Sequence, residues 1–330
     1  MDNPEPDNTS PPKAPRPSLW YLVFTIALAV LLLYLALKGV SWEEMVKTVQ
    51  NGHPQYLALA FAILSISIFS RALRWGILVS AEKPVGARTM FWATAIGYMG
   101  NQFLPARAGE VIRSVMLGRA VDIHAGYVLA TALTERILDV VVLVLVSLVV
   151  LPFLPGMTAW FGQAMWVMGV AGVAALAILF TASRFSHLYR RLLEWLPLPG
   201  KLRQTIQKLI DQFIAGTRAF ADPGRVVRFL GLTAVIWLLD SINAVMIGRM
   251  LGLTIGLPQA FIFLVALGLA SALPSTPGYV GIYQFVAVSM LPIFGIDRSQ
   301  ALTYILAFQA NSVITIGLWG LVGLWRIKKS

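Results

Sequence analysis

The chain has 330 residues, of which 58% are hydrophobic and only 12% are charged, and its mean hydropathy is +0.75. A soluble globular domain is close to half apolar and about a quarter charged. The composition therefore excludes an ordinary soluble enzyme and favours a polytopic α-helical membrane protein. The sequence contains no cysteine, and its three histidines lie far apart. We therefore expect no metal site, no cofactor and no catalytic residue of the cysteine or histidine type.

Residues 1–17 contain six prolines and no apolar run, which predicts a disordered cytoplasmic tail. Residues 18–330 are expected to form a single transmembrane domain. The first uncharged segment is long enough to cross a bilayer of about 30 Å and is predicted to be a retained signal anchor. Segments with few or no charges predict about six full crossings, at residues 19–37, 56–70, 137–153, 159–182, 229–247 and 301–325.

Two further apolar stretches, residues 90–117 and 259–291, are interrupted by proline. Proline stops a helix because it lacks the N–H and clashes with the preceding turn. Each stretch is therefore predicted to be a re-entrant broken helix, lined by protein or by a wet cavity. Both interruptions read Leu-Pro-x-x-x-Gly, from Leu104 and from Leu273. They predict an inverted repeat, with repeat 1 at about residues 54–153 and repeat 2 at about residues 229–327; two unrelated Pro-Gly kinks are the alternative.

The net charge is +11, and the distribution of the basic residues along the chain predicts the orientation in the membrane. If both broken stretches are re-entrant and the N-terminus is cytoplasmic, most basic residues fall on the cytoplasmic side, including Arg71, Arg74 and Arg113. Both termini are then cytoplasmic. Residues 184–228 combine an apolar helical stripe with basic residues. This pattern predicts an amphipathic cytoplasmic segment, lying on the anionic leaflet or packed beneath the membrane domain. No nucleic-acid partner is expected.

Charged residues follow the first interruption and open the next crossing. Arg107, Glu110 and Arg113 are spaced to share one helix face. The second group consists of Glu135, Arg136 and Asp139. A charge inside a membrane helix costs about 2.5–3.5 kcal/mol, so these side chains need partners or a wet cavity. Two interpretations stay open: the charges staple two helices together, or Arg107 and Arg113 bind a lipid phosphate while the other side chains hold them.

Other polar residues complete the set of candidate substrate-binding residues. Asp240 is the only charge in its crossing, and we expect it either to pair with a cation, of which Arg136 is one candidate, or to stay protonated. The second interruption carries no charge and offers main-chain groups and uncharged side chains instead. The remaining candidates are Asn101, Gly278, Tyr283 and Gln284.

Three motifs resemble the signatures of one membrane-protein family. They are GYMGNQFLPARAGEVIR at residues 97–113, TERILD at residues 134–139 and LPSTPGYVGIYQ at residues 273–284. In this order they resemble the transmembrane region of lysylphosphatidylglycerol synthases, also called the flippase-like domain family. The resemblance implies an integral inner-membrane protein that handles or moves polar lipids between leaflets. The family usually has Gly where Tyr279 stands and Glu where Gln284 stands.

The leading hypothesis is a flippase-like protein that binds and translocates an anionic phospholipid or another polar lipid. In the synthases a separate domain transfers lysine to the lipid, and this chain ends directly after its last predicted crossing. The protein is therefore expected not to be an enzyme. The alternatives are a non-catalytic membrane partner of a separate lipid- or glycan-synthesising enzyme, and an intramembrane lipid-modifying enzyme. A homo-oligomer is compatible with each hypothesis.

Overall fold

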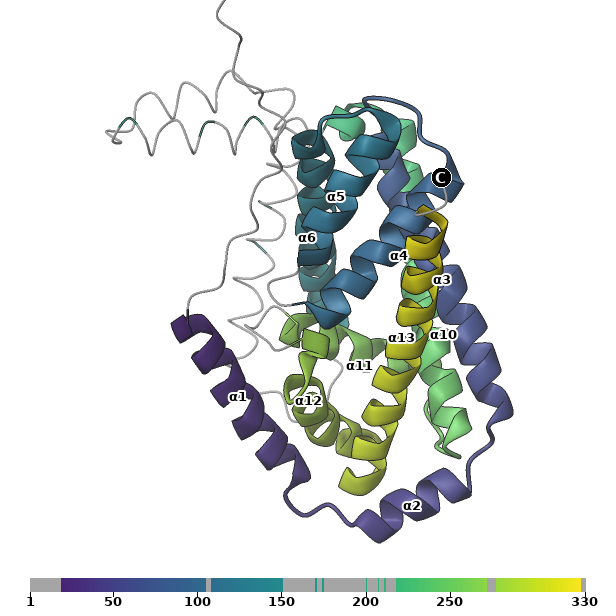
Figure 1. The fold of residues 1–330 in the computed structure, drawn as a ribbon. Helices are drawn as coiled ribbons and strands as arrows, with labels where there is room; N and C mark the ends of the chain where they lie inside the picture. Colours follow the sequence, from purple (N-terminus) through teal and green to yellow (C-terminus); the bar gives the residue numbers. More distant parts are fainter. Residues whose placement is uncertain are drawn as a thin grey trace, which may run out of the picture.

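The computed structural model describes residues 19–104, 108–150, 218–271 and 277–327, with isolated residues between 170 and 211. Within these ranges every regular element is a helix, which confirms the all-α prediction (Figure 1). The longer helices are α1 (Leu19–Leu37), α3 (Gln55–Val79), α4 (Ala87–Phe103), α5 (Ala108–Val121), α6 (Ala125–Val150), α10 (Pro223–Met250), α11 (Leu257–Ala270) and α13 (Arg298–Ile327). The shorter elements are α2 (Trp42–Gln50), η3 (Arg218–Ala221), η4 (Pro277–Tyr279), α12 (Ile282–Met290) and η5 (Leu291–Phe294).

Three of the described helices, α3, α10 and α13, are long and apolar enough to cross a membrane. Helices α1 and α2 meet at a bend of 78°, and together they would count as a fourth span. These four coincide with the crossings predicted at residues 56–70, 229–247, 301–325 and 19–37. The crossing predicted at residues 137–153 begins within α6, which is described to Val150. The crossing predicted at residues 159–182 lies outside the described residues, apart from isolated positions.

Helix α3 is longer than predicted, and its length changes the place of two arginines. The crossing was expected to end at Ser70, with Arg71 and Arg74 in a cytoplasmic loop, but α3 continues to Val79. Arg74 is buried, and Arg71 is largely covered. Acidic side chains of α6 and α10 pair with both guanidiniums, so the helix continues without exposing either charge to lipid. Arg113, also assigned to the cytoplasmic side, is fully buried as well.

Two elements at the ends of the membrane helices differ from the prediction. The unpredicted helix α2 exposes Trp42, Val46 and Val49, a spacing that places them on one face as in an interfacial helix. Helix α10 begins at Pro223, where the Asp222 side chain accepts a hydrogen bond from the Gly224 N–H. The last residues of the predicted amphipathic segment 184–228 therefore belong to α10. Residues 184–217 lie outside the described residues, apart from isolated positions.

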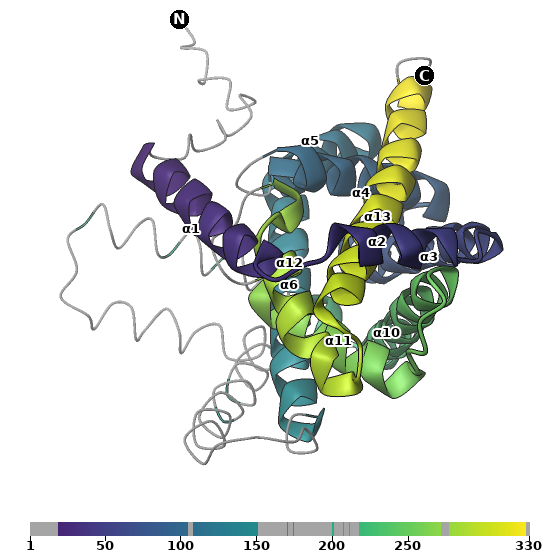
Figure 2. The same cartoon turned by 90° about the horizontal axis from the view of Figure 1, so that it is seen from below.

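The two predicted broken helices occupy opposite halves of the structure. The pair α4–α5 lies in the upper half of Figure 1, and the pair α11–α12 lies in the lower half, whereas α1 lies at the edge against α12 (Figure 2). The interruptions themselves, residues 105–107 and 272–276, lie outside the described residues. Their flanks meet, because a Cβ atom on Gly278 would lie 3.3 Å from the side-chain nitrogen of Gln102.

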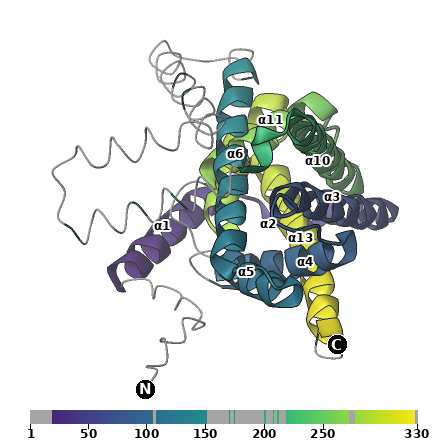
Figure 3. The ribbon, with the colours of Figure 1, turned by 90° about the horizontal axis from the view of Figure 1, so that it is seen from above.

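The charged side chains adjoin the apolar cores of the described residues, of which the third and smallest includes Leu138 and Phe229. The upper core lies among α3, α4, α5 and α6 and includes Trp75 and Leu117; Figure 3 shows these helices from above. The lower core lies among α10, α11, α12 and α13 and includes Phe263 and Tyr304. On α3 and α6 the charged positions adjoin upper-core residues such as Ala72 and Ala132, and on α10 Asp240 precedes the lower-core residue Ala244. Burial of these apolar neighbours thus helps to hold the charged side chains inside the helix bundle.

Helices α4 and α5 contact each other through glycines. A Cβ atom on Gly100 would lie 2.8 Å from the Cα atom of Gly109, and one on Gly97 would lie 2.7 Å from the Cδ atom of Arg113. A Cβ atom on Gly109 would overlap the Gly97 carbonyl and lie 2.6 Å from the Asn101 nitrogen. Only glycine permits this approach, and the approach brings α5 with its charges against α4.

We expect Gly109→Ala to destabilise the protein by about 1–3 kcal/mol, because the added methyl group must push α5 away from α4. Thermal unfolding of the purified protein in detergent measures the change. The matched control is Gly231→Ala in α10, where an added Cβ atom meets no heavy atom within 4 Å. That substitution should stabilise by about 0.5–1 kcal/mol, because alanine favours a helix interior over glycine. Equal shifts of the two variants would contradict the close contact.

Candidate functional site

Four helices contribute side chains to one charged cluster. Helices α3 and α10 are neighbours, as are α5 and α6, and ion pairs join their charged side chains. Within the described residues the cluster contains four arginines and four carboxylates, so its formal charge is zero. Its members are Arg71, Arg74, Glu110, Arg113, Glu135, Arg136, Asp139 and Asp240.

Glu135 is the centre of the cluster. Its carboxylate is fully buried and lies 2.8 Å from an Arg74 nitrogen and 3.0 Å from an Arg113 nitrogen. Arg136 approaches the same carboxylate at 3.9 Å. A single carboxylate therefore links α3, α5 and α6. This part of the cluster fits the stapling interpretation, because a buried charge without its partners is costly.

Arg113 lies behind the wall of the site. Its guanidinium is fully buried, stands 4.2 Å from the ring centre of Trp75 and pairs with Glu110 at 2.5 Å. It is not among the described residues that line the nearby cavity. The structure therefore places Arg113 against Glu110 and Glu135 and away from the cavity lining, and its contact with a lipid phosphate stays a prediction. Arg107, the other predicted phosphate ligand, lies outside the described residues.

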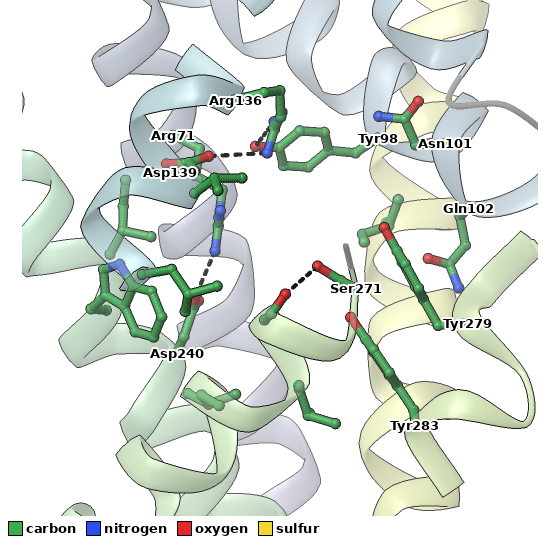
Figure 4. Close-up of a pocket in the computed structure, with 18 of the residues that line it drawn as sticks. Arg71, Tyr98, Asn101, Gln102, Arg136, Asp139, Asp240, Ser271, Tyr279 and Tyr283 are labelled. Atoms are coloured by element: carbon green, nitrogen blue, oxygen red, sulfur yellow. Dashed lines mark hydrogen bonds and ion pairs between the residues drawn. The ribbon is translucent and has the colours of Figure 1, made fainter. Parts of the chain in front are cut away.

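Arg136 and Asp139 form the partly exposed edge of the cluster. Their side chains are 24% and 27% exposed, and a guanidinium nitrogen lies 3.1 Å from a carboxylate oxygen. Arg136 also pairs with Glu110 at 3.0 Å and donates to the Tyr98 hydroxyl at 3.3 Å (Figure 4). A planar guanidinium held by several acceptors is well placed to exchange one of them for another anion. Asn101, also predicted, donates to Glu110 at 3.1 Å.

Asp240 pairs with Arg71, and this corrects the predicted partner. The Arg71 guanidinium contacts one carboxylate oxygen, and the Ser67 hydroxyl donates to the other at 2.6 Å. Arg136 was a candidate partner for Asp240, but its ion pairs are with Glu110, Glu135 and Asp139. The sequence did contain a signal for the longer helix α3 that carries Arg71, because the residues from Trp75 to Val79 continue the apolar run beyond Arg74.

A cavity of about 370 Å³ adjoins the cluster. Charged side chains line it, with Arg71, Arg136, Asp139 and Asp240 facing inward (Figure 4). Apolar side chains also line it, namely Val140, Leu143, Ile236, Trp237, Leu264, Leu267, Phe308 and Ile316. A closely packed protein interior has few such spaces. The cavity can therefore admit a molecule that has both a polar and an apolar part.

Gln284 and Gly278 shape the backbone after the second interruption. The Gln284 oxygen accepts from the Gly281 N–H at 2.7 Å, while its nitrogen donates to Gln309 at 2.5 Å. Gln309 in turn donates to the Gly278 carbonyl at 2.8 Å. Gly278 and Gly281 have φ angles of +69° and +89°, which glycine adopts readily. Gln284 is buried and is not among the described residues lining the cavity, and its contact with a substrate stays a prediction.

Two tyrosines form one wall of the cavity. Tyr279 and Tyr283 stack with ring centres 4.7 Å apart and planes 5° apart, and both line the cavity (Figure 4). Tyr283 was a predicted site residue. Tyr279 has a φ angle of +58°, a conformation that is rare for a bulky side chain. Such strained residues gather at functional sites, where the surrounding structure holds them.

The strained backbone at Tyr279 predicts which of two variants at this position is the more stable. Tyr279→Gly and Tyr279→Ala remove the same ring, but only glycine relieves the left-handed backbone, so the glycine variant should be more stable by about 1–2 kcal/mol. At Tyr283, inside helix α12, the alanine variant should instead be more stable than the glycine variant by about 0.5–1 kcal/mol. Thermal unfolding of the four variants measures both differences. If the alanine variant at Tyr279 is at least as stable as the glycine variant, as expected at Tyr283, the Tyr279 backbone is not strained.

The comparisons with known proteins fit this architecture. Residues 22–320 match the family model described as lysylphosphatidylglycerol synthase TM region. The chain belongs to this family. The family and the three membrane-length helices identify a multi-pass membrane protein. Among the described residues, no group of three or more His, Asp or Glu side chains is arranged to hold a metal ion.

Two curated relatives extend the comparison. Glycosyltransferase AglD of Haloferax volcanii is 26% identical over 336 residues, an alignment that covers 90% of this chain and 52% of that protein. A UPF0104 membrane protein of Methanocaldococcus jannaschii is 22% identical over 117 residues, covering 34% of this chain and 35% of that protein. The matched region is thus about half of the first relative and about a third of the second. No solved structure matches the chain.

Proposed function

We propose that this membrane protein binds the polar headgroup of a lipid in the cavity and moves that lipid between leaflets. The observation that carries the proposal is a cavity inside the helix bundle that is lined by both paired charges and apolar side chains. A lipid likewise combines a polar headgroup with apolar chains. Charged residues inside a membrane domain are costly and are a mark of function.

The arginines favour an anionic headgroup, such as a phosphate. A guanidinium binds two oxygens of a carboxylate or a phosphate with similar geometry. Asp139 pairs with Arg136, and Asp240 pairs with Arg71. A phosphate that replaced Asp139 at Arg136 would leave Arg74 as a remaining partner for Asp139, at 2.7 Å. The guanidinium of Arg136 can therefore bind a ligand while Asp139 keeps an arginine partner.

The route across the membrane is assigned to the two broken helices. In this proposal, α4–α5 and α11–α12 are the re-entrant pairs of an inverted repeat, entering from opposite faces with both termini cytoplasmic. Alternating access of one central site through two related halves is common among transporters. The contact between Gln102 and Gly278 supports this proposal, because it joins the flanks of the two interruptions beside the cavity.

Liposomes containing the purified protein test the proposed transport. Fluorescent phosphatidylglycerol and phosphatidylcholine are placed in both leaflets, and a membrane-impermeant reductant then bleaches only the outer leaflet. Transport predicts that nearly all of the anionic lipid becomes reducible, whereas protein-free liposomes lose only the outer half. If lipids with several headgroups stay half-protected, as in protein-free liposomes, the proposal fails.

The glycosyltransferase relative favours a second candidate function. Because the shared region is about half of that protein, this chain would present a polar lipid to a separately encoded lipid- or glycan-synthesising enzyme. Lipid analysis of cells lacking the protein distinguishes the two functions. A missing lipid product that Arg136→Ala restores fully would favour a scaffold. A new lipid made by the purified protein alone would favour an enzyme.

A further inference from the structure

A second, apolar groove lies beside the charged cavity. It has a volume of about 550 Å³ and is formed by α6, α10 and α11. Several of its side chains, including Leu230, Leu238 and Leu257, are exposed. The residues that line it are Val142, Val146, Leu230, Thr233, Ala234, Trp237, Leu238, Ser241, Leu257, Pro258 and Phe261.

The groove offers hydrocarbon surface to an occupant. Among the described residues that line it, the only polar side chains besides the Trp237 indole are Thr233 and Ser241. The Thr233 hydroxyl donates to the Phe229 carbonyl at 2.9 Å, and the Ser241 hydroxyl donates to the Trp237 carbonyl at 2.8 Å. Both donors are therefore used within α10. A polar ligand would lose its hydration here without compensation, whereas a hydrocarbon chain would not.

The groove and the charged cavity share a wall that is formed by side chains of α10. Trp237 lines both spaces, and Asp240, which lines the cavity, is one helical turn farther along α10. Thr233, on the groove side, accepts a hydrogen bond from Arg74, which lines the cavity, at 3.3 Å. One layer of α10 side chains thus separates the polar space from the apolar one.

We propose that this groove holds a hydrocarbon chain of the same lipid whose headgroup occupies the charged cavity. The inference rests on the proposed function and adds a substrate class, namely a polar lipid with at least one long hydrocarbon chain. Trp237 lies at the boundary between headgroup and chain, where an indole is favoured because one end is apolar and the other polar. The headgroup alone lacks the contacts of the groove and binds more weakly than the whole lipid.

Filling the groove tests the inference. Ala234→Phe places a ring in the groove, and Val235→Phe places the same ring at an exposed neighbouring position that does not line it. Transport of a long-chain fluorescent phosphatidylglycerol should fall about tenfold in the Ala234 variant, the loss expected if about two methylenes of the chain are displaced. It should be unchanged in the Val235 variant. Equal rates in both variants and in the unmodified protein would overturn the inference.

Photolabelling gives a second measurement that needs no substitution in the groove. A phosphatidylglycerol with a photoreactive group in its acyl chain should label the groove segments of α10 and α11, and Arg136→Ala should reduce that labelling about tenfold. Labelling of the exposed residues Leu318 and Leu321 on α13 should not change, because these sites do not depend on the headgroup. Unchanged groove labelling would reveal ordinary surrounding lipid only and would overturn the inference.

These experiments separate the two proposals. If Arg136→Ala stops transport but leaves groove labelling unchanged, the proposed function stands and the groove assignment is wrong. If the unmodified protein transports no lipid, the proposed function is wrong, and the labelling experiment alone then decides the groove assignment. Headgroup-dependent labelling without transport would support the groove as part of a lipid-binding site in a non-transporting protein.

Discussion

Glu135→Ala is expected to destabilise the folded protein by about 3–5 kcal/mol, the loss typical of a buried ion pair from which one partner is removed. The substitution leaves Arg74 and Arg113 buried, and each loses a carboxylate at 3.0 Å or less. Both arginine side chains are almost completely buried, so bulk water does not reach them to replace that carboxylate. The yield of monodisperse protein and its thermal unfolding in detergent measure the effect.

The control for this prediction is Glu43→Ala on helix α2. The Glu43 side chain is 77% exposed and pairs with Lys47 at 2.7 Å, and an exposed pair of this kind contributes about 0.2–1 kcal/mol. A Glu135 variant as stable as the Glu43 variant would show that Glu135 does not link α3, α5 and α6. That result would remove the stapling role of the cluster.

Arg136→Ala is expected to reduce lipid transport about 10–100-fold while leaving the protein folded, because a hydrogen bond to a charged group contributes about 1.5–3 kcal/mol. The fold tolerates the change because its carboxylate partners keep other cations. Glu110 remains paired with Arg113 at 2.5 Å, and Asp139 remains paired with Arg74 at 2.7 Å. Transport is measured in liposomes, and folding is measured by thermal unfolding of the same preparation.

Two comparisons sharpen this prediction. Arg136→Lys should not restore transport, because an ammonium group cannot pair two oxygens in the planar geometry of a guanidinium. Arg228→Ala, at an exposed position whose side chain bonds to the carbonyl of Gly224, should transport lipid at the normal rate. Normal transport by Arg136→Ala would remove Arg136 from the headgroup site.

The sequence predicted those features of the fold that depend on local patterns. Composition indicated a helical membrane protein, and residues 19–37 form α1 as predicted. The interruptions after Leu104 and before Pro277 separate α4 from α5 and α11 from the turn η4. These predictions succeeded because hydropathy and proline act within a few residues of the chain.

The sequence was less informative about the pairing of charges. Arg71 and Arg74 end an apolar run, which usually marks the membrane surface, yet both are covered by acids from α6 and α10. Asp240 and its partner Arg71 are 169 residues apart in the chain. Such pairs depend on how the helices pack, and no local spacing predicts them. The burial of Arg113 depends in the same way on the contact between α4 and α5, where its side chain packs against Gly97.

Native mass spectrometry of lipid-bound protein tests the central claim most directly. The purified protein is released from micelles supplied with phosphatidylglycerol, and the lipid that stays bound is identified by its mass. We predict that the unmodified protein and Arg228→Ala each retain one lipid molecule at energies that strip the Arg136→Ala variant bare. Equal retention by all three proteins, or none by any, would contradict a headgroup site at Arg136.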